Sequence, residues 1–599
     1  MTEPAETPPT ARQWLGLVAV ALGVALIVVD LTIVNVILAP IIEDLSIGSS
    51  EAQWIQESYA ITFAALLLVT GRLSDLHGAR RIFLLGLAVF GATSLLAALA
   101  PSGGLLILAR FVQGVGGAMM LPTSLALLNA TFTGRARGQA FAVWGSTIGA
   151  AAAVGPLLGG WLADISWRWA FGINIPLVAL IVWGVLRYLD VSPRTRGRID
   201  GVGAVLSAVG LGLLSFVLIE GRTYGWLMTT KPLEVGALSW SGGLSPVFVA
   251  LILSVLALGA FWRRQAVLSR AGDEPLMDVG LFSIRSFRNG NFVTLMVGLG
   301  EFGIIAVLPL WLQFALGYSA FEAGLALVAL AAGSFAASGA SFPMTATVSA
   351  LAQVRIGLVL EAAGLTMLAL IASTDSTWWL IAIALFVYGI GVGFATAQVT
   401  NIVLVDVPEQ SGGQASGIQS AARELGSALG IALLTTLFFS TLASGVTDRL
   451  TRDGLSADEA ERIGGVVTDS AGSVIGSLAA QPRTASAAEA AREAMAAGVQ
   501  VTGHVCAGLL LLALAATLFM SPKARTTAHT SPRTSPRTEA GTADAGTADA
   551  GTADAGTADA GTADAGTADA GTADAGTADA GTEARGADLG ERTAVRPPE

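Results

Sequence analysis

A carboxyl group lies deep within the first long apolar run of the chain. Asp30 follows Gly16 and Gly23 at seven-residue steps, inside LIVVDLTIVNV, and residues seven apart share one face of a helix. Glycines on that face predict close helix packing. A charge at the centre of a bilayer costs at least about 2.5–3.5 kcal/mol on insertion scales, and burial favours the neutral acid. The expected chemistry is therefore uptake and release of a proton, with a structural, hydrogen-bonded carboxyl as the alternative.

A second candidate is an arginine inside another apolar run. The sequence ARFVQGVGGAMMLPTS places Arg110, Gln113 and Gly117 on one stripe of a helix. Arginine is rare inside a membrane span unless it faces a polar interior. We therefore expect Arg110 to point inward. The alternative is a long side chain that extends its charge to the membrane surface.

Further charged residues lie inside later apolar runs. Glu301 lies in GLGEFGII, and Glu424 follows Arg423 in AARELGSALG. Neighbours on a helix point about 100° apart, so Arg423 and Glu424 need not pair with each other. We expect Glu301, Arg423 and Glu424 to be candidates for contact with a cationic substrate. Glu57 and Glu361 lie nearer the ends of their runs and are expected to reach water.

These side chains require long membrane helices to position them. The 599 residues are 53% hydrophobic and only 13% charged, against about 25% charged in a soluble protein. A bilayer crossing needs about 20 apolar residues. The sequence predicts an all-α membrane protein with about fourteen spans, near residues 14–38, 52–70, 82–100, 104–129, 139–163, 168–189, 201–220, 244–262, 290–312, 322–345, 355–373, 377–403, 414–440 and 504–521.

Arginine is concentrated on one side of these spans, as at Arg72, Arg80 and Arg81. The protein is expected in the plasma (inner) membrane. Basic loops mark the cytoplasmic side, so both termini are expected in the cytoplasm. The predicted parts are an N-terminal segment 1–13, a six-helix half 14–190, two inserted helices in 200–263, a cytoplasmic linker 264–289, a second half 290–521 with a long extracellular loop 442–503 that forms short amphipathic helices, and a disordered tail 522–599 with GTADA repeats.

The loop Gly71 to Arg81 reads GRLSDLHGARR. It matches the pattern Gly-x-Leu-x-Asp-x-x-Gly-x-Arg-Arg and so resembles the signature of the major facilitator superfamily. An ordinary positive-inside hairpin is the alternative, although charge bias alone requires neither the aspartate nor the glycines. The resemblance implies a gating or conformational role for the matching residues Gly71, Asp75, Gly78, Arg80 and Arg81.

Two further motifs resemble one branch of that superfamily, the fourteen-span drug:proton antiporters of the EmrB/QacA type, and a third, GPLLGG, resembles the antiporter motif of exporters in the superfamily. Asp30 begins a match to Asp-x-Thr-Ile-Val-Asn, although Pro40 lies one residue later than usual, and Arg110 begins Arg-x-x-Gln-Gly-x-Gly. The resemblance implies proton coupling through Asp30 and Arg110. It also implies the major facilitator fold, with two six-helix halves and two extra central helices. The exporter motif GPLLGG implies a hinge seam between the halves at Gly155, Pro156, Gly159 and Gly160, with a static packing seam as the alternative.

The predicted function is export of lipophilic or cationic drugs by proton-coupled alternating access. A metabolite importer or symporter on the same fold, and a non-transporting membrane sensor that uses the acidic tail, are the alternatives. Neither lysine, Lys231 nor Lys523, ends a phosphate-binding loop, so we expect no ATP-driven pump. We expect no enzyme activity, cofactor or metal either, and with a net charge of −11 no nucleic-acid partner. The expected partners are a small molecule, protons and the lipid bilayer.

Overall fold

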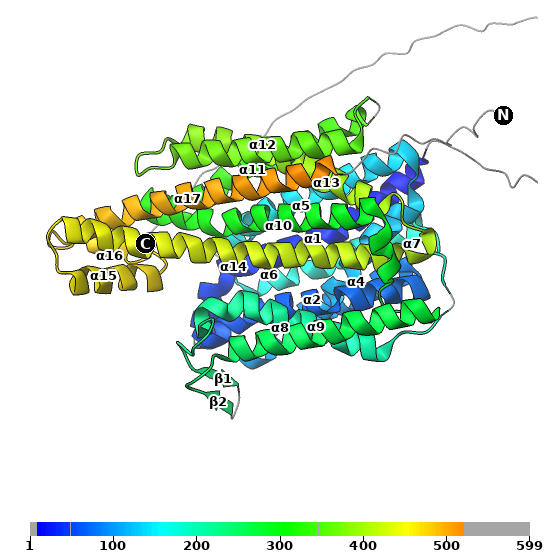
Figure 1. The fold of residues 1–599 in the computed structure, drawn as a ribbon, viewed down its shortest axis with the longest axis horizontal. Helices are drawn as coiled ribbons and strands as arrows, with labels where there is room; N and C mark the ends of the chain where they lie inside the picture. Colours follow the sequence, from blue (N-terminus) through cyan, green and yellow to red (C-terminus); the bar gives the residue numbers. More distant parts are fainter. Residues whose placement is uncertain are drawn as a thin grey trace, which may run out of the picture. The chain divides into compact units, whose positions relative to one another are not determined.

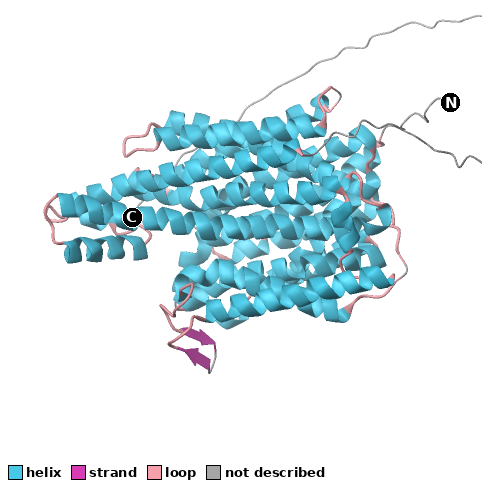
Figure 2. Cartoon of the chain, in the orientation of Figure 1, coloured by secondary structure: helices cyan, strands magenta, loops and turns pink. Residues whose placement is uncertain are grey.

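The fold is almost entirely helical in the computed structural model of the chain (Figure 2). The structure describes residues 9–47, 49–163, 165–195, 197–235, 238–345 and 347–519. Their helices belong to the first of two units into which the chain divides, Met1–Ala524 and Arg525–Glu599. The predicted disordered tail with its GTADA repeats lies outside the described residues.

The first set of helices covers the predicted N-terminal half. A capping box of Thr10 and Gln13 starts the first helix. The predicted span 168–189 is divided at Ile173, because Pro176 follows closely and has no amide hydrogen to continue the ladder. The helices are α1 (Ala11–Leu45), α2 (Ser49–His77), α3 (Ala79–Ala98), α4 (Gly103–Thr131), α5 (Gly134–Ala163), α6 (Arg168–Gly172) and α7 (Asn174–Tyr188).

Two inserted helices follow and pack against each other, and α8 also packs against α2. They are α8 (Gly201–Tyr224) and α9 (Pro246–Ala271), joined by a hairpin of β1 (Leu233–Val235) and β2 (Leu238–Trp240). Asp200 caps the first helix, and Ser245 caps the second with Pro246 in its first turn. The strands pair antiparallel, with Leu233 opposite Trp240. Figure 1 shows the two helices side by side, with the hairpin beyond one end of them.

The remaining helices cover the predicted second half: α10 (Arg285–Leu310), α11 (Ala320–Met344), α12 (Ala350–Ile371), α13 (Trp378–Leu404), α14 (Gly412–Arg452), α15 (Ala457–Asp469), α16 (Ile475–Ala479) and α17 (Ala485–Leu518). Short turns of 3₁₀ helix, Val279–Ser283 and Glu409–Ser411, precede α10 and α14, and a π-helical turn, Trp311–Ala315, ends α10.

Helices α14 and α17 are longer than the spans 414–440 and 504–521 predicted for them (Figure 1). They continue side by side because a small residue on each allows close approach: a Cβ at Gly445 would lie 2.8 Å from the Cβ of Ala494. Only α15 and α16 lie between them, so the predicted loop 442–503 consists largely of extended membrane helices and the short helices that join them.

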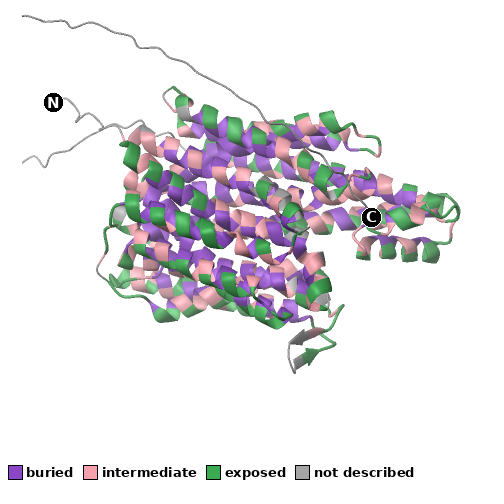
Figure 3. Cartoon of the chain, turned by 180° about the vertical axis from the view of Figure 1, so that it is seen from behind, coloured by how far each residue is buried: buried purple, intermediate pink, exposed green. Residues whose placement is uncertain are grey.

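Thirteen helical segments among the described residues are long and apolar enough to cross a membrane. The remaining predicted span, 139–163, falls on helix α5, several of whose side chains lie outside the described part of the chain. Figure 3 shows buried residues through the middle of the helices and exposed ones on their outer faces. Apolar residues are exposed there, such as Val255 and Leu256 of α9, as expected for a face in contact with lipid.

The two largest buried apolar clusters follow the two halves. The cluster of the second half contains only residues of α10 to α17 and the turns between them. The cluster of the first half also takes in residues of α13 and α14, such as Val403 and Ile418. The halves meet where α2 and α4 contact α14 and where α5 contacts α11 and α13.

Candidate functional site

Asp30 lies at the centre of a buried polar network formed by four helices. Its carboxylate forms an ion pair with Arg110 of α4. It also accepts hydrogen bonds from the side-chain amides of Gln113, at 2.9 Å, and Asn174 of α7, at 3.0 Å. Both amides also donate to the hydroxyl oxygen of Ser94 of α3, at 3.0 and 3.1 Å. Two residues predicted from the sequence, Asp30 and Arg110, are thus brought together.

Arg110 is fully buried and does not extend to a membrane surface. Its Nε donates to the backbone carbonyl of Ile55 at 3.2 Å, and its guanidinium lies over the ring of Tyr59, 4.5 Å from the centroid. The ring centroid of Phe171 lies 5.8 Å from the same guanidinium. Such rings stabilise a desolvated cation through their π faces. One guanidinium nitrogen, Nη2, has no hydrogen-bond partner among the described residues.

The charge of this network depends on whether Asp30 carries a proton. Protonation of Asp30 would remove the negative charge that holds Arg110, and the amides of Gln113 and Asn174 would then face a neutral acid. The network also supplies the Asp30 carboxylate with hydrogen-bond partners, which a purely structural role would require as well. The geometry therefore suits either role, and the proton-coupling role is taken up below.

A second group of charged residues lies in the other half. Arg423 of α14 forms an ion pair with Glu301 of α10 at 3.2 Å. It does not pair with its neighbour Glu424, in agreement with the offset between adjacent helix positions. Glu424 is half-buried and lies within electrostatic range of Tyr59 in the first half. Glu424 thus interacts electrostatically with the first half across the boundary between the halves.

Glu361 of α12 is fully buried, which contradicts the expectation that it reaches water. Both of its carboxylate oxygens lack a hydrogen-bond partner among the residues that the structure describes. Its distance from the end of the span was misleading, because α13 covers it: a Cβ at Gly391 would lie 2.6 Å from the Cγ of Glu361. Glu57 is also buried, at 9% exposure, which contradicts the prediction that it reaches water.

Asp75 joins the two halves at the end of the helices that holds Arg72, Arg80 and Arg81, which we call the basic end. Its carboxylate accepts hydrogen bonds from the backbone amides of Gly413, at 2.6 Å, and Gln414, at 2.9 Å. These amides open α14, and a helix N-terminus favours a negative charge.

Gly71 makes this junction possible. A Cβ at Gly71 would lie 2.5 Å from the carbonyl oxygen of Gly413 and 3.0 Å from the Cα of Gly417. Any side chain would therefore push α2 away from α14. We call the contacts of Gly71 and Asp75 with the start of α14 the interhalf seam.

Other residues of the signature loop contact the linker and the segment after α7, and Arg72 pairs with Glu274 of the linker at 3.6 Å. Gly78 has φ of 90°, which only glycine adopts without strain. The backbone amide of Arg80 donates to Ser192 at 3.1 Å, and its side chain donates to the carbonyl of Leu186 at 2.9 Å. Arg81 is exposed. The loop therefore anchors the segment after α7, and Asp75 alone among its charged residues reaches the start of α14.

The glycine face of α5 is placed differently from the prediction. A Cβ at Gly155 would overlap the hydroxyl of Thr32 in α1, which belongs to the same half. Contact with the other half is made further along, where a Cβ at Gly145 would lie 3.2 Å from the Cβ of Ala397. Gly159 is buried. The side-chain positions of Pro156 and Gly160 lie outside the described part of the helix.

The inserted helices are linked to the seam by hydrogen bonds. Asp200 binds Arg264 and Gln265 of α9, at 2.9 and 3.0 Å. The Gln265 oxygen accepts the amides of Leu276 and Met277 in the linker. The backbone amide of the next residue, Asp278, donates at 2.8 Å to the side-chain oxygen of Gln414, and the backbone amide of Gln414 donates to Asp75. Sequence reasoning missed this connection.

The pKa of Asp200 responds to two opposing effects. Burial raises the pKa, but hydrogen bonds from Arg264, Gly203 and Gln265, together with the charge of Arg264, outweigh it. The pKa therefore lies below its ordinary value, and Asp200 is held as a carboxylate at the junction of α8 and α9.

Asn174, Ser94 and Tyr59 were also missed. Asn174 is the only one with a sequence signal, because an amide just before Pro176 interrupts an apolar run. Ser94 and Tyr59 are common residue types in membrane helices, and their role depends on how α2 and α3 are rotated against α4. Rotation about the helix axis is set by tertiary packing, which the span pattern does not contain.

Curated relatives match most of the chain. One is the "Probable actinorhodin transporter" of Streptomyces coelicolor, 34% identical over 457 residues, which cover 74% of this chain and 75% of the relative. Another is the "Multidrug efflux pump LfrA" of Mycolicibacterium smegmatis, 32% identical over 529 residues, which cover 86% of this chain and 97% of the relative. A third is the "Puromycin resistance protein pur8" of Streptomyces alboniger, 34% identical over 75% of this chain.

A solved structure shares the fold. The human organic anion transporter MFSD10 aligns with a TM-score of 0.51 at 14% identity, over 85% of this chain and 100% of that one. The sequence profile of the Major Facilitator Superfamily matches residues 20–431, which include Asp30, Asp75, Arg110 and Arg423. The chain therefore belongs to the major facilitator superfamily.

Proposed function

We propose that this protein is a proton-coupled secondary transporter that exports lipophilic or cationic drugs or antibiotics by alternating access. The observation that carries the proposal is the buried ion pair of Asp30 and Arg110 inside one half of a two-half transporter fold. The family resemblance adds the proton-coupling role, and relatives named as efflux or resistance proteins support the direction and the class of substrate.

The orientation follows from the distribution of arginine. The basic end would face the cytoplasm, and with it both termini. The interhalf seam then closes the cytoplasmic side in this conformation, because Asp75 binds the start of α14 and Gly71 lies against Gly413 and Gly417.

Proton binding would change the network as follows. A proton that reaches Asp30 from outside neutralises the carboxylate, so Arg110 loses its anionic partner and still donates to the side-chain oxygen of Gln113 and the carbonyl of Ile55. Only neutral acceptors then hold the guanidinium, and the first half can rearrange against α14. Breaking the hydrogen bonds of Asp75 opens the cytoplasmic side. Each proton that moves down the membrane potential supplies about 2.3 kcal/mol per 100 mV.

Coupling requires that the substrate and the proton prefer different states. Glu424 is the best candidate to contact a cationic substrate, because it is half-buried and lies near Tyr59 across the boundary between the halves. Glu301 and Arg423 would act together, since their ion pair must open before either contacts a ligand. A cationic substrate bound at Glu424 would then lie across the boundary from the proton site of the first half.

Dye transport in inside-out vesicles tests the proposal. Ethidium, a fluorescent lipophilic cation, should accumulate inside the vesicles when their interior is made acidic relative to the medium. Accumulation should collapse with a proton ionophore and in Asp30→Asn. Asp44→Asn is the matched control on the same helix, because Asp44 lies in an exposed pair with Arg168.

Two results would count against the proposal. Undiminished uphill accumulation of ethidium by Asp30→Asn would show that Asp30 is not the proton site. Proton-driven uptake of a metabolite into whole cells, with no movement of ethidium in vesicles, would favour the importer.

A further inference from the structure

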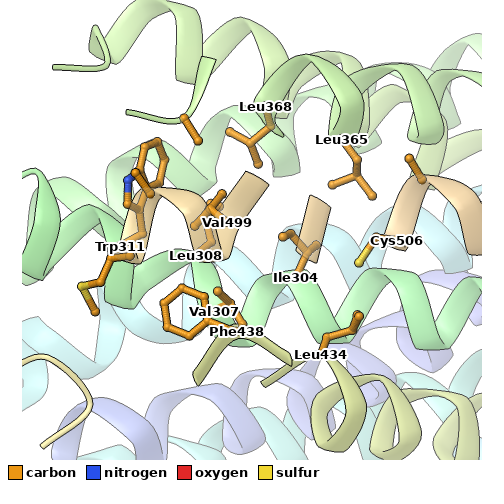
Figure 4. Packing of buried hydrophobic residues seen from close by; sticks show 14 of the residues in the cluster. Ile304, Val307, Leu308, Trp311, Leu365, Leu368, Leu434, Phe438, Val499 and Cys506 are labelled. Atoms are coloured by element: carbon orange, nitrogen blue, oxygen red, sulfur yellow. The ribbon is translucent and has the colours of Figure 1, made fainter. Parts of the chain in front are cut away.

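Glu361 is the least explained charged residue in the described chain. Its side chain is fully buried in α12, and both carboxylate oxygens lack a hydrogen-bond partner there. Leu365, one turn further along α12, belongs to the apolar cluster of the second half, and Figure 4 shows it in that cluster with Ile304 of α10 and Cys506 of α17. The side chain therefore reaches neither water nor a polar backbone group.

The titratable groups around Glu361 come from four helices. Tyr388 of α13 is fully buried, and its hydroxyl also lacks a partner within the described residues. Cys506 of α17 is buried. Glu301 of α10 and Arg423 of α14 lie within electrostatic range of Glu361, and Glu424 of α14 lies within range of Arg423 and Glu301. The cluster thus holds three carboxyl groups and one guanidinium.

The single cation is already engaged. Arg423 forms its ion pair with Glu301 at 3.2 Å and none with Glu361 in this conformation. A buried carboxylate with neither a hydrogen bond nor an ion pair is strongly unfavourable, whereas a neutral acid is far less so. Arg423 can neutralise one carboxylate and is paired with Glu301, so the fully buried Glu361 is the group that requires a proton.

We propose that Glu361 is a second proton-binding site of this protein, and that it exchanges its proton with Glu301 as Arg423 moves between them. In this conformation Glu361 is the neutral acid and Glu301 the carboxylate. When the guanidinium leaves Glu301 for Glu361, the proton on Glu361 passes to Glu301. One O–H bond breaks and one forms, and the net charge of the three groups is unchanged.

The exchange brings the proton to a more accessible group. Glu301 is 5% exposed and Arg423 is half-buried, whereas Glu361 is fully enclosed. Glu301 could therefore pass the proton to water, in addition to the proton carried by Asp30. This last step rests on the proposed function, but the state of Glu361 does not.

Infrared spectroscopy of the purified full-length protein tests the site directly. A neutral carboxylic acid has a C=O stretch that is well separated from carboxylate bands and shifts in heavy water. At neutral pH the wild type should show such a band, and Glu361→Gln should lose it. Glu459→Gln, an exposed position on α15, should leave it unchanged. A band that persists undiminished in Glu361→Gln overturns the proposal.

A second variant tests the exchange and does not remove Glu361. In Glu301→Gln the guanidinium of Arg423 has no carboxylate at its present position, so it should turn to Glu361. The neutral-acid band should then disappear at neutral pH and return only in acid. A band that is identical in the wild type and Glu301→Gln overturns the exchange, whereas a merely structural Glu361 would not respond to a change at Glu301.

Vesicle measurements separate this proposal from the proposed function. With ethidium as the probe, Glu361→Gln should lower the number of protons exchanged for each dye molecule by one, with Asp30 intact. An unchanged ratio overturns the transport step. If the wild type moves no ethidium while the infrared results are as expected, the exporter proposal fails and the proton site of Glu361 stands.

Discussion

The two halves of this transporter bury acidic residues in opposite ways. In the first half, Asp30 has a guanidinium and two amides as partners, and the amides are themselves held by Ser94. In the second half, Arg423 serves Glu301 and leaves Glu361 without a partner among the described residues. The comparison shows that a buried carboxyl can be stabilised by neighbouring donors or, as we propose for Glu361, by a proton.

The difference also bears on how each cluster can change. In the Asp30 network the carboxylate is already paired, so a proton that bound there would weaken its ion pair with Arg110. The second cluster has one cation and three acids, so its ion pair can move with little change in the number of contacts. The first half would thus couple proton binding to a large rearrangement, and the second would adjust its charges within a fixed core.

The largest effect should come from removing the cation of the first half. Arg110→Ala leaves Asp30 buried without its ion pair, which should lower the free energy of unfolding by about 3–5 kcal/mol and abolish ethidium exchange. Thermal unfolding of the purified protein measures the first effect. Arg12→Ala is the control, because its pair with Asp190 is exposed and should contribute about 0–1 kcal/mol.

The double variant Asp30→Asn/Arg110→Ala sharpens this prediction. It removes both charges, so it should recover part of the stability that Arg110→Ala alone loses. If the double variant is less stable than Arg110→Ala, the ion pair is not the origin of the loss.

A smaller loss is expected for Arg423→Ala in the second half. Glu301 can take up a proton when its partner is gone, so the destabilisation should be about 1–3 kcal/mol. The same unfolding assay compares the two arginine variants. If Arg423→Ala lowers the free energy of unfolding as much as Arg110→Ala, the proposed difference between the halves is wrong.

Asp200 provides a carboxylate outside both clusters, with an ordinary pH dependence. Its pKa is lowered in the folded protein, so its stabilising effect is complete above the unfolded pKa and is lost as the pH falls through the folded pKa. Asp200→Asn should therefore lower stability at neutral pH by about 1 kcal/mol, and the difference from the wild type should vanish in strong acid. A difference that is independent of pH would contradict this account.

The smallest effect is expected at Tyr59. Its hydroxyl lacks a described partner, while its ring lies 4.5 Å from the guanidinium of Arg110. Tyr59→Phe should change stability by less than about 0.5 kcal/mol, and Tyr59→Leu should cost about 0.5–2 kcal/mol because it loses the cation–π contact. Equal losses in the two variants would show that the hydroxyl, and not the ring, supports Arg110.

Residue type and depth in a span were enough to predict that Asp30 and Arg110 face the interior of the bundle, because a charge in an apolar run needs a partner. The same reasoning was wrong for Glu361. Its position along α12 suggested access to water, but Gly391 of α13 allows a neighbouring backbone to cover it. Which helix covers a residue depends on contacts between segments far apart in the chain.

The fold shows the same division. Long apolar runs predicted the helices and the membrane class, since each run is nearly self-sufficient in length and composition. The ends of α14 and α17 were not predicted, because their extensions, Ala-rich only in α17, have no strong apolar signal and are stabilised by packing against each other. The seam face of α5 was misplaced in the same way: Gly155 lies against Thr32, and Gly145 contacts the other half.

Proton movement driven by a substrate gradient tests the central claim most directly. Proteoliposomes with a pH-sensitive dye inside would be given an ethidium gradient, without any imposed proton gradient. We predict that the wild-type protein moves protons against the flow of ethidium, and that Asp30→Asn moves ethidium with fewer protons or none. Proton movement by Asp30→Asn at the wild-type rate and ratio would contradict the role of Asp30.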